Sequence, residues 1–226
     1  MTPLVKVLLV GRGRMGRLIE SLAPEYGIDI VGTVGRDSAS DPDGWPQADV
    51  AVDFSTAEAV PRNARALTRR GISLVIGTTG WQQEEPALRR DLAGLPVGVI
   101  AAPNFAIGVN LFLEIAAQAA RLIADRGFGG WIHEAHHAAK KDAPSGTALA
   151  IQQVVNAAGH AVDVASTRAG FIPGTHTLGF DSAAETITLT HVARDRTAFA
   201  RGALEAARWI HGRRGWFGMK DMLEGR

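Results

Sequence analysis

The stretch Val5-Lys-Val-Leu-Leu-Val-Gly-Arg-Gly-Arg-Met-Gly16 decides the fold of this 226-residue chain. Its first half, Val5 to Val10, is a short apolar run of the kind that parallel sheets bury on both faces. A Gly-x-Gly-x-x-Gly pattern follows at once, and a helical pattern of apolar residues continues from Met15 to about Glu25. Ile28 to Val34 is predicted to be the next strand. Strand, glycine loop, helix and strand within about 30 residues is the context that a dinucleotide-binding fingerprint requires.

Each glycine of this pattern serves a physical purpose. Gly11, Gly13 and Gly16 permit, in turn, a tight bend, close approach of the backbone to a pyrophosphate, and close packing of helix against strand. The unpaired N–H groups at the helix start add partial positive charge. We therefore predict a bound dinucleotide; a glycine turn with a purely structural role is the alternative.

The end of the second predicted strand, Val34-Gly-Arg-Asp37, bears on which dinucleotide is used. Gly35 stands where NAD enzymes usually carry an acid, whereas Arg36 suits the 2′-phosphate of NADP. Asp37 is close enough in sequence to reach a ribose hydroxyl. We expect NADPH and leave NADH open; two solvated loop charges are the alternative.

Strands and helices continue to alternate after this point, with further strands predicted over 49–54, 73–76 and 96–102. Five β/α units favour an α/β fold with a doubly wound parallel sheet. Gly77-Thr-Thr-Gly80 follows the fourth strand, at the edge where open α/β sheets bind ligands. An ordinary strand–turn–helix link is the alternative for this segment.

The pattern changes after Asn104, where a long apolar helix is predicted over 108–125 and is expected to be buried. Strand-like segments at 128–132, 162–167, 176–180 and 185–193, with a helix at 146–158 between the first two, then predict a smaller α+β domain with an open mixed sheet. The last strand alternates threonines with Ile187, Leu189 and His191, so an exposed β-branched face favours self-association. We divide the chain into a nucleotide-binding domain, 1–105 with 196–226, and a substrate-binding and oligomerisation domain, 106–195.

The candidate chemistry is concentrated in Glu134-Ala-His-His-Ala-Ala-Lys-Lys-Asp-Ala-Pro-Ser-Gly-Thr-Ala148, where a strand gives way to a helix. His136 and His137 point to opposite sides in an extended strand, so one of them can face a cleft. Histidine exchanges its proton near neutral pH. Lys140 is suited to bind a carboxylate, or to give a proton if burial lowers its pKa.

The helix that begins near the end of this stretch supplies a second feature. Ser145 is a good N-cap, and the free amides of Gly146 and Thr147 form an anion site at the helix start. The stretch therefore predicts a small acidic substrate at an interdomain cleft, with a general acid beside it. A surface histidine pair, solvated lysines and a plain helix cap are the alternatives. A metal site is disfavoured because no third ligand follows at helical spacing.

Composition excludes several classes of protein. The 24 Lys and Arg residues nearly balance the 23 Asp and Glu residues, so nothing favours a nucleic-acid partner. The chain has no cysteine, which excludes a thiol nucleophile and a thiolate metal site. No apolar run approaches the roughly 20 residues that span a membrane, so we expect a cytoplasmic protein.

The whole signature from Glu134 to Ala148 resembles that of the bacterial dihydrodipicolinate reductases, also called 4-hydroxy-tetrahydrodipicolinate reductases, of lysine and diaminopimelate biosynthesis. The resemblance runs nearly end to end. It includes Gly13-Arg-Met-Gly16, Asp53-Phe54, Gly77-Thr-Thr-Gly80, Ala102-Pro-Asn-Phe105, Gly108-Val-Asn110, Arg168-Ala-Gly170, Gly174-Thr-His176 and Trp216-Phe-Gly-Met-Lys-Asp-Met-Leu223.

The resemblance implies a Rossmann domain completed by the C-terminal segment, a homotetramer built through the sheets of the second domain, and hydride transfer from NADPH or NADH to a dicarboxylate ring. It implies that His136 donates a proton and that Lys140 donates a proton or holds the substrate's charge. His137, Gly146 and Thr147 would bind the two carboxylates. The cofactor would contact Gly11, Arg12, Gly13, Arg14, Met15, Gly16, Gly77, Thr78, Thr79, Ala102, Pro103, Asn104 and Phe105.

Three positions depart from the family's common pattern: the glycine loop is one residue shorter, Gly35 replaces a usual Glu, and Ala106 stands where Ser is frequent. The second departure argues against a strong NADH preference. Two other functions are compatible with a chain of this build. An amino-acid dehydrogenase of similar build should lack the Lys140–Thr147 cluster, and a non-catalytic nucleotide sensor should have lost His136 or Lys140.

Overall fold

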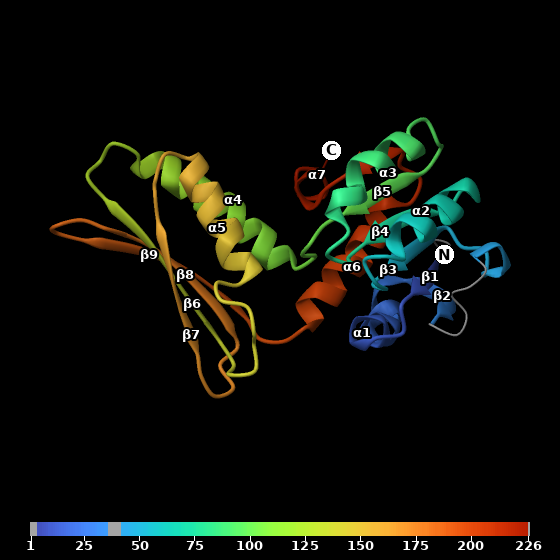
Figure 1. Cartoon of the computed structure of the whole chain (residues 1–226), viewed down its shortest axis with the longest axis horizontal. Helices are drawn as coiled ribbons and strands as arrows, with labels where there is room; N and C mark the ends of the chain where they lie inside the picture. Colours follow the sequence, from blue (N-terminus) through green and yellow to red (C-terminus); the bar gives the residue numbers. More distant parts are fainter. Residues whose placement is uncertain (1–3, 36–41, 226) are drawn as a thin grey trace. The chain divides into compact units, whose positions relative to one another are not determined.

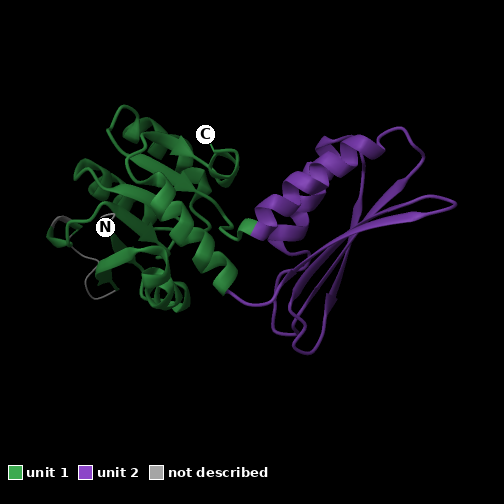
Figure 2. Cartoon of the chain, turned by 180° about the vertical axis from the view of Figure 1, so that it is seen from behind, with its two compact units in different colours: residues 1–107, 197–226 green, residues 108–196 purple. Residues whose placement is uncertain are grey.

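The computed structural model describes residues 4–35 and 42–225, which form two compact units. Unit 1 contains residues up to Ile107 together with Thr197 onward, and unit 2 runs from Gly108 to Arg196 (Figure 2). Each unit has a sheet of its own, with two hydrophobic cores in unit 1 and one in unit 2. Among the described residues, no helix is both long enough and apolar enough to span a membrane.

Unit 1 is built on a six-stranded sheet in which every pair of neighbours is parallel, with the order β10-β5-β4-β3-β1-β2 (Figure 1). The strands are short and apolar because both faces of the sheet are covered. They are β1 (Val5–Val10), β2 (Ile28–Val34), β3 (Val50–Asp53), β4 (Ser73–Ile76), β5 (Gly98–Ala101) and β10 (Gly215–Phe217).

Helices cover the two faces of this sheet with separate cores. α1 (Arg14–Leu22) and α6 (Thr197–Ile210) contribute to one core, and α2 (Val60–Arg69) and α3 (Glu85–Leu92) to the other. The chain's last elements, β10 and α7 (Met219–Leu223), belong to unit 1, since β10 pairs with β5 and Met219 is buried in the first core. The C-terminal segment therefore completes the Rossmann-like sheet.

Unit 2 is a four-stranded mixed sheet, order β7-β6-β8-β9, with two helices on one face (Figure 1). β6 pairs parallel with β7 and antiparallel with β8, which pairs antiparallel with β9. Apolar residues of this face and of the helices form the third core. The elements are α4 (Ile107–Ile123), β6 (Gly129–His136), α5 (Gly146–Ala157), β7 (Asp163–Arg168), β8 (Gly174–Asp181) and β9 (Thr186–Ala193).

Three details differ from the sequence predictions. The first helix ends at Leu22 rather than near Glu25, because Pro24 lacks a backbone donor and the chain continues as a 3₁₀ turn over Ala23–Tyr26. α4 is not buried all round: Leu111, Ile115 and Leu122 are exposed, since only one side of the helix packs on the sheet.

The third difference concerns β6, which continues to His136 instead of stopping at Ile132. The prediction ended the strand where polar residues begin. Glu134 can nevertheless occupy a completely buried strand position, because the guanidinium of Arg168 on β7 compensates its charge.

Candidate active site

The glycine loop of unit 1 has three glycines in three different surroundings. Gly11 has φ +108°, and a Cβ there would lie 2.4 Å from the carbonyl oxygen of Phe54. A Cβ on Gly16 would lie 2.1 Å from the carbonyl oxygen of Gly11. Gly13 is the N-cap of α1, and a Cβ there would have no neighbour within 4 Å. No side chain caps the N–H groups at this helix start. The loop therefore leaves open space beside uncapped N–H groups, which fits a pyrophosphate.

The other predicted cofactor residues of this loop, Arg12, Arg14 and Met15, lie at the start of α1, with both arginines exposed. A Cβ on Gly35, at the end of β2, would lie 3.9 Å from Cβ of Arg12. Arg12 therefore lies beside the end of β2, where dinucleotide-binding proteins usually contact the ribose of the cofactor. Arg36 lies outside the described residues.

The loop after β4 is fixed by a buried carboxylate. Asp53, only 2% exposed, accepts hydrogen bonds from Ser55, from Asn63 at 3.0 Å and from the Thr78 hydroxyl at 3.1 Å. The Thr78 carbonyl accepts a bond from the Trp81 ring N–H. The hydroxyl and the carbonyl of Thr78 therefore already have hydrogen-bond partners within the protein, whereas the side chain of the neighbouring Thr79 is exposed.

The loop after β5 contains the remaining predicted cofactor residues. Phe105 is 2% exposed and packs edge-on to Phe54, so its ring belongs to the core and only its backbone can face a ligand. Asn104 accepts a bond from the backbone N–H of Ala106. Ala102 is half-buried and Pro103 exposed. Together with the glycine loop, these segments line the carboxyl edge of the parallel sheet.

Strand register in unit 2 brings polar residues into two adjacent rows on the helix-covered face. Glu134 of β6 is opposite Ser166 of β7 and His176 of β8, which is opposite His191 of β9. In the next row, His136 is opposite Arg168. Because alternate residues of a strand share a face, Ile132, Glu134 and His136 point the same way, and the inner face changes from apolar to polar along β6.

Glu134 is the centre of this polar cluster and has no exposed surface. Nη2 of Arg168 donates to Oε1 at 2.6 Å, and the backbone N–H of Ser145 donates to the same oxygen at 3.3 Å. Nδ1 of His136 lies 2.6 Å from Oε2. Burial raises the pKa of Glu134, but hydrogen bonds from Arg168 and Ser166 and the charges of His136 and Arg168 outweigh it and lower that pKa to about 2.

The surroundings lower the pKa of two histidines of the cluster. Burial lowers the pKa of His136; Glu134 opposes this effect, and the charges of Lys140 and Arg168 add to it. Burial and then the nearby His136 lower the pKa of His176 to about 4. The two rings meet edge-on, with centroids 5.2 Å apart. A negatively charged ligand beside them would shift His136 back toward its protonated form.

Lys140 lies in the loop after β6, with its side chain three-quarters buried. Its ammonium group contacts both oxygens of Asp142, at 2.7 and 2.9 Å. Arg168 also donates to the backbone carbonyl of Asp142 at 2.6 Å. A substrate carboxylate that binds Lys140 must therefore compete with an exposed intramolecular partner.

The start of α5 lies beside the same cluster. Ser145 is the N-cap, since its hydroxyl accepts from the N–H of Ala148, and the same hydroxyl lies 3.0 Å from Nε2 of His176. Gly146 is exposed and Thr147 half-buried at the first two helical positions. His137 follows the end of β6 and is exposed. His136 and the helix start are thus linked through Ser145 and its contact with Glu134.

The cluster also resembles a cation site, because ligand atoms of Glu134, His136 and His176 lie within 4.8 Å of one another. Sequence reasoning missed this third ligand, which comes from a distant strand rather than from helical spacing. These three residues do not fit a bound metal cation, because the guanidinium of Arg168 already forms an ion pair with Glu134 and places a positive charge beside the site.

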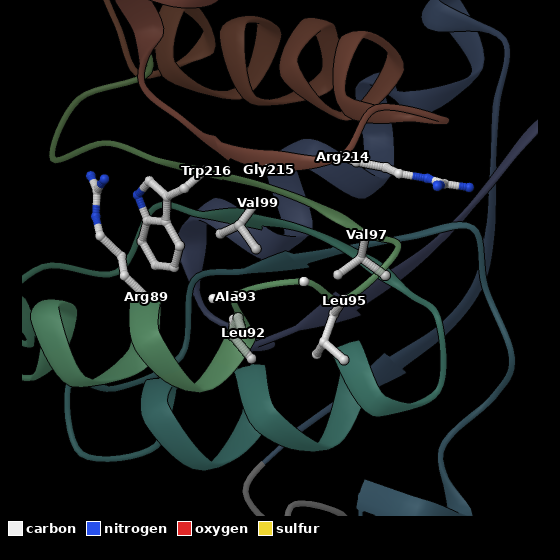
Figure 3. A pocket seen from close by; sticks show the side chains of 10 residues that line it. Arg89, Leu92, Ala93, Leu95, Val97, Val99, Arg214, Gly215 and Trp216 are labelled. Atoms are coloured by element: carbon white, nitrogen blue, oxygen red, sulfur yellow. The ribbon is translucent and has the colours of Figure 1, made fainter.

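A hollow of about 340 Å³ lies elsewhere in unit 1, at the edge where β5 and β10 begin (Figure 3). Leu92, Val97, Val99 and Trp216 form its apolar part, and the guanidinium of Arg89 lies 4.8 Å from the centre of a Trp216 ring. This is the edge opposite to the glycine loop, so the hollow is separate from the predicted cofactor residues.

Two sequence-family models match nearly the whole chain. The model described as dihydrodipicolinate reductase, N-terminus, matches residues 5–105, and the model described as dihydrodipicolinate reductase, C-terminus, matches residues 108–223. The chain belongs to the dihydrodipicolinate reductase family. The resemblance recognised in the sequence is thereby confirmed, as is the two-domain α/β architecture expected of a dihydrodipicolinate reductase.

Individual relatives agree with this membership. The chain is 39% identical to the 4-hydroxy-tetrahydrodipicolinate reductase of Acidiphilium cryptum, covering 93% of this chain and 94% of the relative. It is 35% identical to that of Archaeoglobus fulgidus, covering 94% and 96%. The dipicolinate-bound dihydrodipicolinate reductase from Paenisporosarcina sp. TG-14 has the same fold, with a TM-score of 0.79 at 22% identity, covering 95% of this chain and 97% of that one.

Sequence reasoning assigned no role to several residues of the cluster. Glu134, Asp142, Arg168 and His176 lie within the motifs that carry the family resemblance, but sequence spacing alone indicates no role for them. One signal was available, because Glu134 precedes His136 by two residues and therefore shares its face of a strand. The partners on β7 and β8 depend on register and could not be read from spacing.

Proposed function

We propose that this chain reduces 4-hydroxy-tetrahydrodipicolinate, with loss of water, to tetrahydrodipicolinate in lysine and diaminopimelate biosynthesis. The observation that carries the proposal is the family membership of both halves, joined to a polar cluster beside a helix start in unit 2. In the overall reaction one hydride and one proton enter the substrate and one water leaves. The reduced nicotinamide supplies the hydride when it is bound.

We assign the proton to unit 2. His136 is the proton donor, and Lys140 donates a proton or holds the substrate's negative charge. The ring of His136 is mostly buried beside Glu134, and a bound dianion favours its protonated form. General acids of this kind contribute about 10² to 10⁴-fold to rate.

We assign the two substrate carboxylates to His137 and to the start of α5. Gly146 and Thr147 occupy the first helical positions, where N–H groups have no helical partners. Lys140 can turn to a carboxylate if its contact with exposed Asp142 is given up. The dicarboxylate class is supported by the relative that was solved with dipicolinate bound.

We assign the cofactor to the carboxyl edge of the unit 1 sheet and expect NADPH to be preferred over NADH. Gly13 and the uncapped start of α1 suit the pyrophosphate. Gly35 stands where an acid would favour NADH, and Arg12 lies next to it. Arg36, the next residue in sequence, remains the predicted clamp for the 2′-phosphate.

We also propose that the protein assembles as a homotetramer through the helix-free face of the unit 2 sheet. Trp131 lies flat across Gly179 on this face and is 37% exposed. Thr177 and Thr190 bond each other, as do His133 and Thr167, so covering these polar groups leaves few of them unpaired. A second copy of this face is the partner that such a surface fits.

The proposal is tested by following oxidation of NADPH and of NADH with freshly made 4-hydroxy-tetrahydrodipicolinate, and by identifying the product by mass spectrometry. Substrate-dependent oxidation that yields tetrahydrodipicolinate is expected. Oxidation that depends on an amino or keto acid instead would identify the amino-acid dehydrogenase alternative. Tight cofactor binding without turnover of any of these substrates would favour the sensor alternative.

A further inference from the structure

Glu134 holds one particular nitrogen of His136. Their closest atoms, Oε2 and Nδ1, are 2.6 Å apart. The contact lies outside regular hydrogen-bond geometry, and neither atom has another hydrogen-bond partner among the described residues, but two lone pairs this close would repel each other, so one of the two atoms carries a proton. The carboxyl is ionised across the physiological range because its pKa is about 2, so that proton resides on Nδ1. The other ring nitrogen, Nε2, is then left to exchange a proton with a ligand.

The surroundings of Nε2 agree with this division. A Cβ added to Gly174 would lie only 3.0 Å from Nε2, so this edge of the ring packs against a residue that has no side chain to cover it. Glu134 itself cannot be the acid, since it has no exposed surface. Its other oxygen, Oε1, accepts hydrogen bonds from Arg168 and from the backbone N–H of Ser145, which restrict the orientation of the carboxylate.

We propose that Glu134 is a positioning residue for proton transfer: it fixes the Nδ1–H tautomer of His136, directs Nε2 toward the substrate and stabilises the imidazolium that forms there. Arg168 completes the arrangement by keeping Glu134 ionised and in place. The inference deepens the proposed function and rests on His136 as its proton donor.

The charges around His136 predict how the pH dependence responds. Glu134 on β6 raises the pKa of His136, whereas burial and the cations Lys140, in the following loop, and Arg168, on β7, lower it. His176, on β8, is neutral near pH 7 because its own pKa is about 4. If the charge of Glu134 is removed, burial and the two cations, which all lower the pKa of His136, are no longer opposed. His136 should then lose its proton at a lower pH than in the wild type.

The direct test needs no variant. Nitrogen-15 NMR of the histidines in the ligand-free, full-length wild type should show neutral His136 with its proton on Nδ1. Assignment is made by comparison with His136→Gln. An Nε2–H tautomer in the wild type would overturn the proposal. The measurement does not require turnover, so it remains informative even if the proposed reaction is wrong.

The second test uses Glu134→Gln, whose amide can donate to Nδ1 and stabilise the opposite tautomer. We expect kcat to fall by about 10- to 100-fold, the range known for removal of the outer hydrogen-bond partner of a metal-bound histidine. The basic limb of the kcat profile should move to lower pH, and the KM for NADPH should stay constant. A lower kcat with an unmoved pH limb and an unchanged tautomer would show that Glu134 is merely structural.

Glu134→Asp serves as the conservative variant and guards against misfolding of the Gln variant. It keeps the charge that Arg168 requires, and it should retain the pH limb of the wild type with a smaller loss of kcat. A pH limb in Glu134→Asp that shifts as far as in Glu134→Gln would contradict the charge-based account. Circular dichroism and cofactor titration, which reports on unit 1, establish that each variant is folded.

Discussion

His136 and Lys140 are held in opposite ways. His136 contacts a carboxylate that has no exposed surface, whereas Lys140 contacts Asp142, whose side chain is 57% exposed. A buried partner fixes a side chain in one geometry, while an exposed ion pair contributes little and exchanges readily. We therefore regard His136 as preorganised and Lys140 as recruited when substrate binds.

The first prediction concerns these two side chains. His136→Ala and Lys140→Ala should each lower kcat by about 10²-fold or more, because each removes a group that transfers a proton or balances charge in the transition state. NADPH affinity should not change, since the predicted cofactor residues belong to unit 1. Steady-state kinetics and a fluorescence titration measure the two effects.

Lys141→Ala is the matched control, because this exposed neighbour has the same charge and no assigned role. A Lys141 variant as impaired as the Lys140 variant would show that local charge, and not Lys140 itself, matters. Wild-type turnover by either alanine variant of His136 or Lys140 would remove that residue from the mechanism.

The second prediction is a dependence of stability on pH at His176. Burial, first, and His136 lower its pKa in the folded protein from 6.5 to about 4. The folded state therefore binds this proton less tightly than the unfolded state, so the contribution is complete above pH 6.5 and is lost as pH falls through 4. Glu134, with a pKa of about 2 against 4.5, acts in the same direction in a lower window.

We expect unit 2 to lose on the order of 2–3 kcal/mol of stability through His176 between pH 7 and pH 4. Denaturant melts at several pH values measure this loss. In His176→Asn, which cannot titrate, the slope between pH 6.5 and 4 should be shallower. An unchanged slope would mean that the buried histidine is not the group responsible.

At the scale of elements, two glycines beside α1 are expected to serve different purposes. Gly16 is needed for stability, whereas Gly13 is needed for cofactor binding. Gly16→Ala forces a Cβ against the carbonyl oxygen of Gly11, whereas Gly13→Ala meets no protein atom and its φ of −78° suits any residue. The third prediction is that Gly16→Ala destabilises the protein by about 1–3 kcal/mol, the usual cost of overpacking. Thermal melts check the expectation.

The companion variant Gly13→Ala should leave stability within about 0.5 kcal/mol of the wild type, as surface substitutions usually do. Cofactor affinity should nevertheless fall about 10-fold or more, because the added methyl enters space that the pyrophosphate is predicted to use. Calorimetric titration with NADPH measures that loss. Equal affinity for the two proteins would move the pyrophosphate away from Gly13.

Sequence periodicity predicted the elements of unit 1 well, for a physical reason. Its strands β1 and β4 are mostly apolar and buried, and each is followed by a glycine, so composition alone delimits them. Prediction did worse where tertiary contacts decide the outcome. β6 extends through Glu134 because Arg168 compensates a buried charge, and that partner is 34 residues away in sequence.

At the scale of the whole molecule, the predicted cofactor residues and the polar cluster lie in two units with separate cores. The residues next to one another in sequence, from His136 to Thr147, were predictable as a site because they form one signature. Glu134, Arg168 and His176 required the pairing of three strands. The signature thus revealed the groups proposed to touch substrate, while the register revealed the groups that hold them.

The fourth prediction concerns assembly. Light scattering should give a mass of four times the 23.9 kDa chain. Thr190→Lys places a charge on the sheet face proposed to meet other copies, and it should yield smaller species. Gln83→Lys, at an exposed position of unit 1, is the control and should remain tetrameric. A Thr190→Lys protein with the mass of the wild type would place the interface elsewhere.

The most direct test of the account is a single turnover with NADPH that carries deuterium at the transferred position. We predict that the wild type and Lys141→Ala place one deuterium in tetrahydrodipicolinate, detected by mass spectrometry. We predict that His136→Ala binds the cofactor equally well and transfers deuterium at least about 10²-fold more slowly. No deuterium in the wild-type product, or transfer at the wild-type rate by His136→Ala, would contradict the account.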